Sequence, residues 1–362
     1  PGGLRTTSFL LPTRNVAILG GYAGCGAPDP DERKLGVYHS ILSGDLNGDD
    51  FSGGDMSDNA YHVVFAGNTT STIILDGFVI EGGNANSVDN PNERGGGIFV
   101  FFTAANPTIR NCIIRRNTAS AKGGGMYAAS MTGLLINCVF TGNWAPDGGA
   151  IFNVNGNMEL VNCTFSGNTA THNGGGIYLA SPDALVLTNS VLWGNSDGGG
   201  MDESAQINLV GRPVVATYNC IQGWTGQHPG VGNFGDDPMF TDADGGDNLP
   251  GTGDDDLRLL LGSPCINSGD PSFTPFGSTD LAGVARVLCG RIDRGAYESG
   301  LGDIDCDGSV DMSDFSVWSD CMTGPEVAGL LDGCEPFDFT GDGRVTLDDF
   351  AAFQIAFSPA AR

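Results

Sequence analysis

Gly148-Gly149-Ala150-Ile151 is one of four similar stretches, the others being Gly95-Gly96-Gly97-Ile98, Gly123-Gly124-Gly125-Met126 and Gly174-Gly175-Gly176-Ile177. The four begin at intervals of 28, 25 and 26 residues, and Gly198-Gly199-Gly200-Met201 is a weaker fifth copy. Two asparagines recur in phase with them, at Asn111, Asn137, Asn162 and Asn189 and then at Asn117, Asn143, Asn168 and Asn195. A fixed period of this length is typical of a solenoid built from stacked repeats.

Each repeat is interpreted as a glycine corner, a short strand, a turn, a second strand and an asparagine-bearing turn. One such unit cannot cover its own apolar side, so it must stack on its copies, and stacked parallel coils form a β-helix. Glycine at the corner supplies backbone with positive φ and removes the Cβ that would clash between coils ~4.8 Å apart. Asparagine in the turn can adopt the left-handed region and pass side-chain amide hydrogen bonds along the stack.

We therefore expect an all-β fold, a right-handed parallel β-helix with coils of about 25 residues. The side chains expected near its interior are Leu135, Cys138, Phe140, Leu160, Cys163 and Phe165. Less regular coils are expected upstream, at 16–19, 61–65 and 73–80, and residues 214–221 are expected to close the stack, giving roughly eight coils between residues 15 and 222. A β-sandwich is the alternative, but sandwiches do not repeat at a fixed period.

The chain is divided into three parts on this basis. A parallel β-helix is expected over 1–222, an irregular end or capping segment over 223–299, and a small α-helical module over 300–362. No stretch approaches the ~18 uncharged apolar residues that a membrane-spanning helix needs. The chain carries 43 Asp and Glu against 16 Lys and Arg, a formal net charge of −27, which disfavours nucleic acid as a partner.

Two twelve-residue frames, 303–314 and 338–349, have oxygen ligands at positions 1, 3, 5, 7, 9 and 12 and glycine at position 6, the spacing of a Ca²⁺-binding loop. The expected ligands are Asp303, Asp305, Asp307, the carbonyl of Ser309, Asp311 and Asp314 in the first loop, and Asp338, Thr340, Asp342, the carbonyl of Arg344, Thr346 and Asp349 in the second. Because Thr340 and Thr346 replace acidic ligands, the second loop is expected to bind Ca²⁺ more weakly.

Position 12 of each loop is Asp instead of the Glu of the common EF-hand, and each loop is followed by one helix, expected over 315–321 and 350–357. Duplicated loop–helix units of this kind resemble a dockerin. The resemblance implies a cohesin partner on a scaffold or a cell surface. Met312-Ser313 and Leu347-Asp348 stand where dockerins often contact their partner, and they differ between the halves, so recognition need not be two-fold.

Two further segments resemble known families. The GGAI stretch at 148–151 and the FxxN motifs at 140–143 and 165–168 resemble the repeat of the polymorphic outer-membrane-protein adhesins. The segment SPCINSG at 263–269, with DLAG at 280–283 and DRGAYE at 293–298, is similar to the end of many secreted bacterial β-helix proteins of the choice-of-anchor type. Those proteins are extracellular, where calcium is millimolar, so we expect a secreted protein associated with the cell surface.

An extracellular address would let cysteines pair. Cys321 and Cys334 bracket the connection between the two calcium units and are the expected disulfide. Cys112, Cys138 and Cys163 should stack in adjacent coils with parallel Cβ vectors, which suits buried thiols better than bridges.

Two other acidic loops are weaker candidates. Residues 45–50 and the group 242–247 with 254–256 alternate oxygen ligands, and each is either a metal site or a solvated loop.

The repeats contain no recognisable catalytic cluster. The candidates for a hydrolase are Asp147, Asp183, Asp197, Asp202 and Glu203, and those for the base of a lyase are Arg94, Arg110, Arg115 and Arg116. The leading hypothesis is a secreted, non-enzymatic structural or adhesive protein that assembles through a cohesin-like partner or with itself. Open strand edges would favour a head-to-tail homo-oligomer. The alternative is a polysaccharide-degrading enzyme, acting on an extracellular glycan and tethered through its dockerin.

Overall fold

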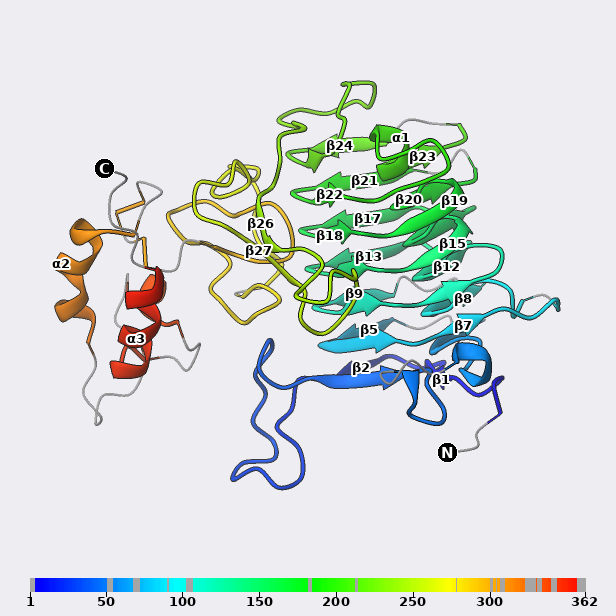
Figure 1. Cartoon of the computed structure of the whole chain (residues 1–362), viewed down its shortest axis with the longest axis horizontal. Coiled ribbons are helices and arrows are strands. Elements are labelled where there is room, and N and C mark those ends of the chain that lie inside the picture. Colours follow the sequence, from blue (N-terminus) through cyan, green and yellow to red (C-terminus); the bar gives the residue numbers. More distant parts are fainter. Residues whose placement is uncertain are drawn as a thin grey trace.

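The computed structural model describes residues 4–50, 55–67, 72–89, 91–101, 107–181, 184–211, 214–277, 279–299, 302–303, 305–306, 310–322, 330, 334–339 and 344–356. Its largest part is a stack of parallel strands that climbs from the amino-terminal end of the chain (Figure 1). Three sheets of seven strands each surround one apolar interior. The expected parallel β-helix is therefore confirmed.

The strands of each sheet follow one another along the stack. Sheet 1 contains β1 (Phe9–Leu10), β4 (Val64–Gly67), β8 (Ile98–Phe101), β12 (Met126–Ala129), β16 (Ile151–Val154), β20 (Ile177–Leu179) and β23 (Ile207–Leu209). Sheet 2 contains β2 (Val16–Leu19), β5 (Ile73–Asp76), β9 (Thr108–Arg110), β13 (Gly133–Ile136), β17 (Met158–Val161), β21 (Leu185–Thr188) and β24 (Val215–Thr217). Sheet 3 contains β3 (Ser40–Ser43), β6 (Phe78–Glu81), β10 (Ile113–Arg115), β14 (Val139–Thr141), β18 (Thr164–Ser166), β22 (Val191–Trp193) and β25 (Cys220–Ile221).

A shorter sheet 4 runs beside the middle coils and contains β7 (Asn84–Ala85), β11 (Thr118–Ala119), β15 (Trp144–Asp147) and β19 (Thr169–Asn173). The prediction of two strands per coil was therefore wrong: a coil has three strands, and the middle coils have a fourth. The register confirms the stacking of the repeats, because Met126 pairs with both Ile98 and Ile151, and Ile151 pairs with Ile177. Leu135, Cys138 and Phe140 are fully buried, as expected, and so are their counterparts Leu160, Cys163 and Phe165.

The glycine corners show both predicted properties, positive φ and close contact with the next coil, but the two properties belong to different glycines. The first glycine of each run has positive φ, namely 64° at Gly95 and Gly123, 66° at Gly148 and 60° at Gly174. The second glycine lies against the next coil, since a Cβ on Gly149 would lie 2.5 Å from the carbonyl oxygens of Thr169 and Gly175. A side chain at either position would therefore strain the corner.

The asparagines form two separate ladders, one with positive φ and one with a continuous run of side-chain amide hydrogen bonds. Asn111, Asn137, Asn162 and Asn189 have positive φ, between 50° and 53°. In the other ladder, the side-chain amide of Asn117 donates to Asn143 at 3.1 Å, that of Asn143 to Asn168 at 2.9 Å and that of Asn168 to Asn195 at 2.8 Å. All four residues of this second ladder are fully buried, so it supplies polar partners inside the apolar stack.

The fifth glycine run is not a repeat corner. Residues 198–201 lie in a turn before the short helix α1 (Glu203–Gln206), and the strand that stacks on Ile177 begins at Ile207 instead of Met201. The inserted helix explains the difference, because it lengthens this coil and carries the chain past the corner. Within the described residues, sheets 1, 2 and 3 have seven strands each, one fewer than the roughly eight coils expected.

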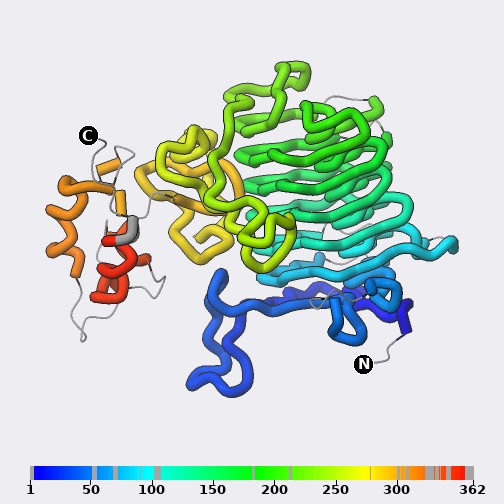
Figure 2. The backbone as a smooth tube through the Cα atoms, in the orientation of Figure 1, coloured from blue at the N-terminus to red at the C-terminus, as the bar shows by residue number. Residues whose placement is uncertain are grey.

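Only a short part of the segment 223–299 covers the end of the stack. Residues 229–234 run along the last coil, where Ala216 N donates to Pro229 O at 2.9 Å and Ile221 N to Phe234 O at 2.9 Å. The rest lies along the side of the stack (Figure 2) and contains the antiparallel pair β26 (Phe240–Asp242) and β27 (Asp256–Leu259). We call residues 240–299 the lateral segment. Its Leu257, Leu281 and Ala296 pack on Val139 of sheet 3.

The carboxy-terminal module contains α2 (Met312–Cys321) and α3 (Leu347–Ala356), with 3₁₀ turns at Glu335–Phe337 here and at Met56–Asp58 near the start of the chain. Both helices begin three residues earlier than expected. The cause at α2 is local: Asp311 accepts from Ser313 N and Asp314 accepts from Asp311 N, which caps the helix at Asp311. Among the described residues, no helix has the length and apolar character required to cross a bilayer.

Candidate functional site

The first predicted calcium loop brings three of its ligands together. One carboxylate oxygen each from Asp303, Asp305 and Asp314 lies within 4.8 Å of the other two. Asp303 and Asp314 are buried, and Asp305 is exposed. Asp311 lies at the cap of α2, while Asp307 and Ser309 lie outside the described residues. Hard oxygen ligands at this spacing fit Ca²⁺ by chemistry.

Asp314 has a structural role besides its predicted one. Its two carboxylate oxygens accept from Asp311 N at 2.8 Å and Asp305 N at 3.3 Å, which folds the loop back onto the first turn of α2. The buried carboxylate is therefore held at the start of a helix, where the helix dipole favours negative charge.

The second loop repeats this arrangement at its end. Asp349, which is fully buried, accepts from Thr346 N at 2.8 Å and from Thr346 Oγ1 at 3.0 Å. Asp338 is half-buried and Arg344 is exposed, while Thr340 and Asp342 lie outside the described residues. Positions 9 and 12 of the two loops thus correspond. The apolar position 8 corresponds as well, since Val310 and Val345 are both fully buried in one cluster.

The two helices share a small aromatic core. The Trp318 ring lies 4.9 Å from that of Phe353 and 4.8 Å from that of Phe337, centroid to centroid. Beside it, Cys321 and Cys334 form the disulfide expected from the sequence. A second disulfide, Cys289–Cys306, joins the lateral segment to the module, and no pattern in the sequence predicted it.

The outer side of this core is apolar and exposed. Met312 is 64% exposed and Leu347 is 71% exposed, and Phe315 is also exposed. A hollow of about 310 Å³ between the helices is lined by Met312, Phe315, Phe350, Phe353 and Gln354. We call this surface the helix face. It includes Met312 and Leu347, two of the residues to which the dockerin resemblance assigns partner contacts.

A groove lies where the lateral segment passes over sheet 3. Two adjoining hollows of about 370 and 340 Å³ share the lining residues His39, Val79, Ile113, Asp255, Leu257 and Tyr297. Asp255 accepts from Gly251 N at 2.6 Å, and burial raises the pKa of its carboxyl. No sequence pattern predicts this groove, because it depends on how the lateral segment docks on sheet 3.

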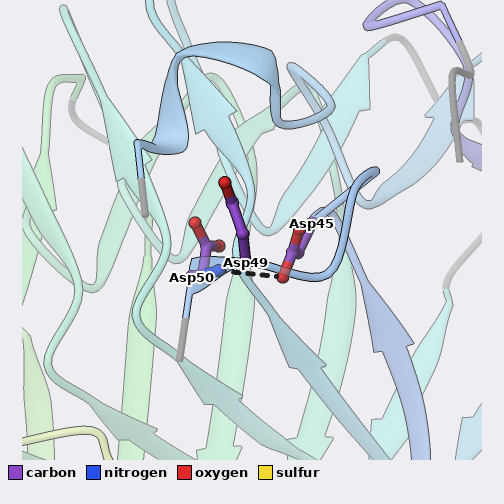
Figure 3. Close-up of side chains that lie close together, drawn as sticks. All are labelled: Asp45, Asp49 and Asp50. Carbon is purple, nitrogen blue, oxygen red and sulfur yellow. Dashed lines mark hydrogen bonds between the residues drawn. The ribbon is translucent and has the colours of Figure 1, made fainter. Parts of the chain in front are cut away.

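The two weaker acidic loops differ. In the first, carboxylate oxygens of Asp45, Asp49 and Asp50 lie within 4.8 Å of one another (Figure 3), and Asp45 accepts from Gly48 N at 2.6 Å. In the second, Asp247 and Asp254 accept hydrogen bonds from the same hydroxyl, Thr252 Oγ1. Backbone and side-chain donors thus hold the carboxylates of both loops in place.

The residues considered for catalysis are engaged in structural contacts. Arg94 pairs with Glu93, Arg110 with Asp76 and Arg115 with Glu81, at nitrogen–oxygen distances of 3.0, 2.9 and 2.8 Å respectively. Arg116 lies beside Asp50 in a small hollow. Among the carboxylates, Asp147 accepts from Asn173, Asp197 from Gly199 N and Asp202 from Ser204 N, while Glu203 is buried beside His228. Asp183 lies outside the described residues.

Comparison with known proteins concerns the stacked coils. Residues 53–213 match the family model described as "Right handed beta helix region". No curated protein gives a significant match to the chain. The family match covers less than half of the chain and, together with the three sheets of stacked parallel strands, supports a β-helix repeat protein.

Proposed function

We propose that this chain is a secreted, non-enzymatic β-helix protein that assembles at a cell surface, and that its carboxy-terminal module is a calcium-dependent, dockerin-like connector. The observation that carries the proposal is the grouping of Asp303, Asp305 and Asp314 at the start of α2. Asp349 holds the corresponding place at the start of α3. Calcium would supply the charge that balances these carboxylates and would fix the loops against the helices.

The disulfides support an extracellular address. Cys289–Cys306 and Cys321–Cys334 are both paired, and structural disulfides persist in oxidising compartments. The first also attaches the module covalently to the lateral segment. A connector attached in this way would stay fixed to the lateral segment when its partner pulls on it, because a covalent bond adds to the non-covalent contacts.

The helix face is the surface proposed to bind the partner. Exposed apolar side chains such as Met312 and Leu347 are typical of a docking surface. The resemblance to dockerins names a cohesin-like protein as the partner. Calcium would act indirectly, by holding α2 and α3 in the arrangement that forms this face.

A binding assay with immobilised cohesin modules tests this proposal, using the full chain in calcium and in excess chelator. We expect binding in calcium, loss of binding in chelator, and at least tenfold weaker binding for Met312→Glu, because a charge would be buried on docking. The matched control is Val88→Glu, at an apolar residue that is 93% exposed on the β-helix. Binding that is unchanged both in chelator and for Met312→Glu would refute the proposal.

Self-assembly is the other mode of association. Strands β1, β2 and β3 are the outer edges of their sheets at one end of the stack. Electron microscopy of the native protein with and without chelator would reveal head-to-tail filaments, whereas isolated particles under both conditions would count against this mode.

A polysaccharide-degrading enzyme is the second candidate, and the groove over sheet 3 favours it. Asp254, Asp255 and Asp256 all line the first hollow, and the raised pKa of Asp255 is the direction that suits a general acid. Incubation with a polysaccharide panel and calcium distinguishes the candidates. New reducing ends or unsaturated products that Asp255→Asn abolishes would establish the enzyme and refute the non-enzymatic proposal.

A further inference from the structure

Two thiols from different parts of the chain meet beside the last coil. Cys220 begins β25, and Cys265 lies in the lateral segment. Both side chains are fully buried, and they belong to one apolar cluster with Val191 and Leu259. The cluster packs Cys220 and Val191 of sheet 3 against Cys265 and Leu259 of the lateral segment. Neither is part of the two disulfides that the structure contains.

The backbone on both sides of this contact is fixed by Arg294. Its backbone N donates to Cys265 O at 3.1 Å, and its Nη1 donates to the carbonyl of Asn219, next to Cys220, at 2.7 Å. Its Nη2 also donates to Ser268 O at 2.9 Å. One arginine therefore ties the last coil to the lateral segment at the position of the two sulfurs, so the pair is held together without a covalent bond.

The cysteines inside the stack differ from this pair. Cys112, Cys138 and Cys163 occupy equivalent positions of successive coils. Each Sγ donates to backbone carbonyl oxygens, as the Cys220 Sγ does to Asp236 O at 3.1 Å, so the difference lies in the repeat. Their Cβ vectors are parallel because the coils repeat, which disfavours a bridge. Cys220 and Cys265 are not related by the repeat, so this constraint does not apply to them.

We propose that Cys220 and Cys265 form a third disulfide in the oxidised protein, joining the last coil of the β-helix to the lateral segment. The oxidant is a small disulfide such as oxidised glutathione. One protein thiolate attacks it to give a mixed disulfide and releases one thiol; the second protein thiolate attacks the protein sulfur of the mixed disulfide and releases another. Two protein thiols are oxidised and one external disulfide is reduced to two thiols.

The burial of the pair sets when this reaction takes place. The neighbouring Cys265 thiol and burial both raise the pKa of Cys220, and the charge of Arg294 opposes the rise. A buried neutral thiol is a poor nucleophile. The bond therefore closes while the lateral segment docks during oxidative folding, and once buried it is shielded from external reductants.

The cross-link would complete a covalent path. Cys220–Cys265 joins the stack to the lateral segment, and Cys289–Cys306 joins the lateral segment to the carboxy-terminal module. This inference does not rest on the proposed function, since the bond would close whether or not the module binds calcium or a partner.

Peptide mapping of the full wild-type chain tests the proposal. The protein is folded in a glutathione redox buffer, denatured without reductant, alkylated with iodoacetamide and digested. We expect a cross-linked peptide containing Cys220 and Cys265, alkylation of Cys112, Cys138 and Cys163, and a mass about 2 Da lower for each of three bonds than the fully reduced chain. Alkylation of both Cys220 and Cys265 in a chain whose Cys321–Cys334 bond is intact would overturn the proposal, as would a bridge from either to another cysteine.

Two variants sharpen the result. Cys265→Ser should make Cys220 fully alkylatable after denaturation. The variant should contain two disulfides instead of three, and no cross-linked peptide should contain Cys220. The matched control, Cys163→Ser, also removes one buried thiol but should leave the 220–265 peptide unchanged. If Cys265→Ser does not fold, the wild-type map decides alone.

Discussion

Truncating one rung of the buried asparagine ladder, with Asn143→Ala, should cost a large fraction of the stability of the stack. The Asn143 amide donates to Ile114 O at 2.9 Å and to Asn168 Oδ1 at 2.9 Å. Its oxygen accepts from both the backbone N and the side chain of Asn117, each at 3.1 Å. Four hydrogen bonds at about 1 kcal/mol each give a loss of about 4 kcal/mol, and a water molecule entering the space would reduce it toward ~2 kcal/mol.

Urea unfolding followed by circular dichroism measures the global effect. Hydrogen exchange of the amides in β10, β14 and β18 measures the local one, which matters because a repeat stack need not unfold in two states. The matched control is Asn208→Ala in β23, a half-buried residue for which no side-chain hydrogen bond is found within the described part of the chain. It should change stability by less than ~0.5 kcal/mol. Equal effects of the two substitutions, or a loss below ~1 kcal/mol for Asn143→Ala, would refute the role of the ladder.

Three further predictions follow from single features. Gly149→Ala should lower the melting temperature far more than Gly277→Ala, because its Cβ would meet carbonyl oxygens 2.5 Å away, whereas the nearest atom to a Cβ on Gly277, which does not have positive φ, would lie 3.9 Å away; equal shifts would contradict the steric argument. Burial raises the pKa of Asp293 to about 7, so its protonated form is favoured in the folded state and the stabilisation falls as pH rises from about 4 through 7. Hydrogen exchange of the amides in 291–299, corrected for the intrinsic rate, should therefore be faster at pH 8 than at pH 5. Equal corrected rates at the two pH values would contradict this effect of Asp293. Replacing Cys321 and Cys334 together by Ser removes a bond across a separation of 13 residues and leaves Cys289–Cys306 in place. It should destabilise the module by about 3 kcal/mol in a denaturant titration followed by hydrogen exchange of the α2 amides, and protection equal to that of the wild type would contradict this.

The repeat could be predicted because its residues have local reasons to recur. Gly148 needs positive φ and Asn143 needs a partner in the next coil, and these demands are the same in every unit. They fix the stacking of Ile151 on Met126 without further information. The same logic predicted the Cys321–Cys334 bond, which lies between two units of a duplicated module.

What the sequence did not predict depends on contacts between distant segments. Strands of three residues, such as Ile113–Arg115, are too short for alternation to distinguish them from turns, so the third strand of each coil was missed. The run at 198–201 has the composition of a corner but precedes a helix. The groove and the Cys289–Cys306 bond arise only when the lateral segment docks on sheet 3 and meets the module, which no local pattern encodes.

Isothermal titration calorimetry of the full chain with calcium tests the central claim, that the carboxy-terminal module is a two-loop calcium connector. We expect a tighter site in the first loop and a weaker one in the second. Asp305→Asn, at an exposed carboxylate grouped with Asp303 and Asp314, should remove the tighter binding phase, whereas Asp320→Asn, at an exposed residue of α2 outside both loops, should leave both phases unchanged. A titration in which Asp305→Asn binds calcium as the wild type does would contradict the account.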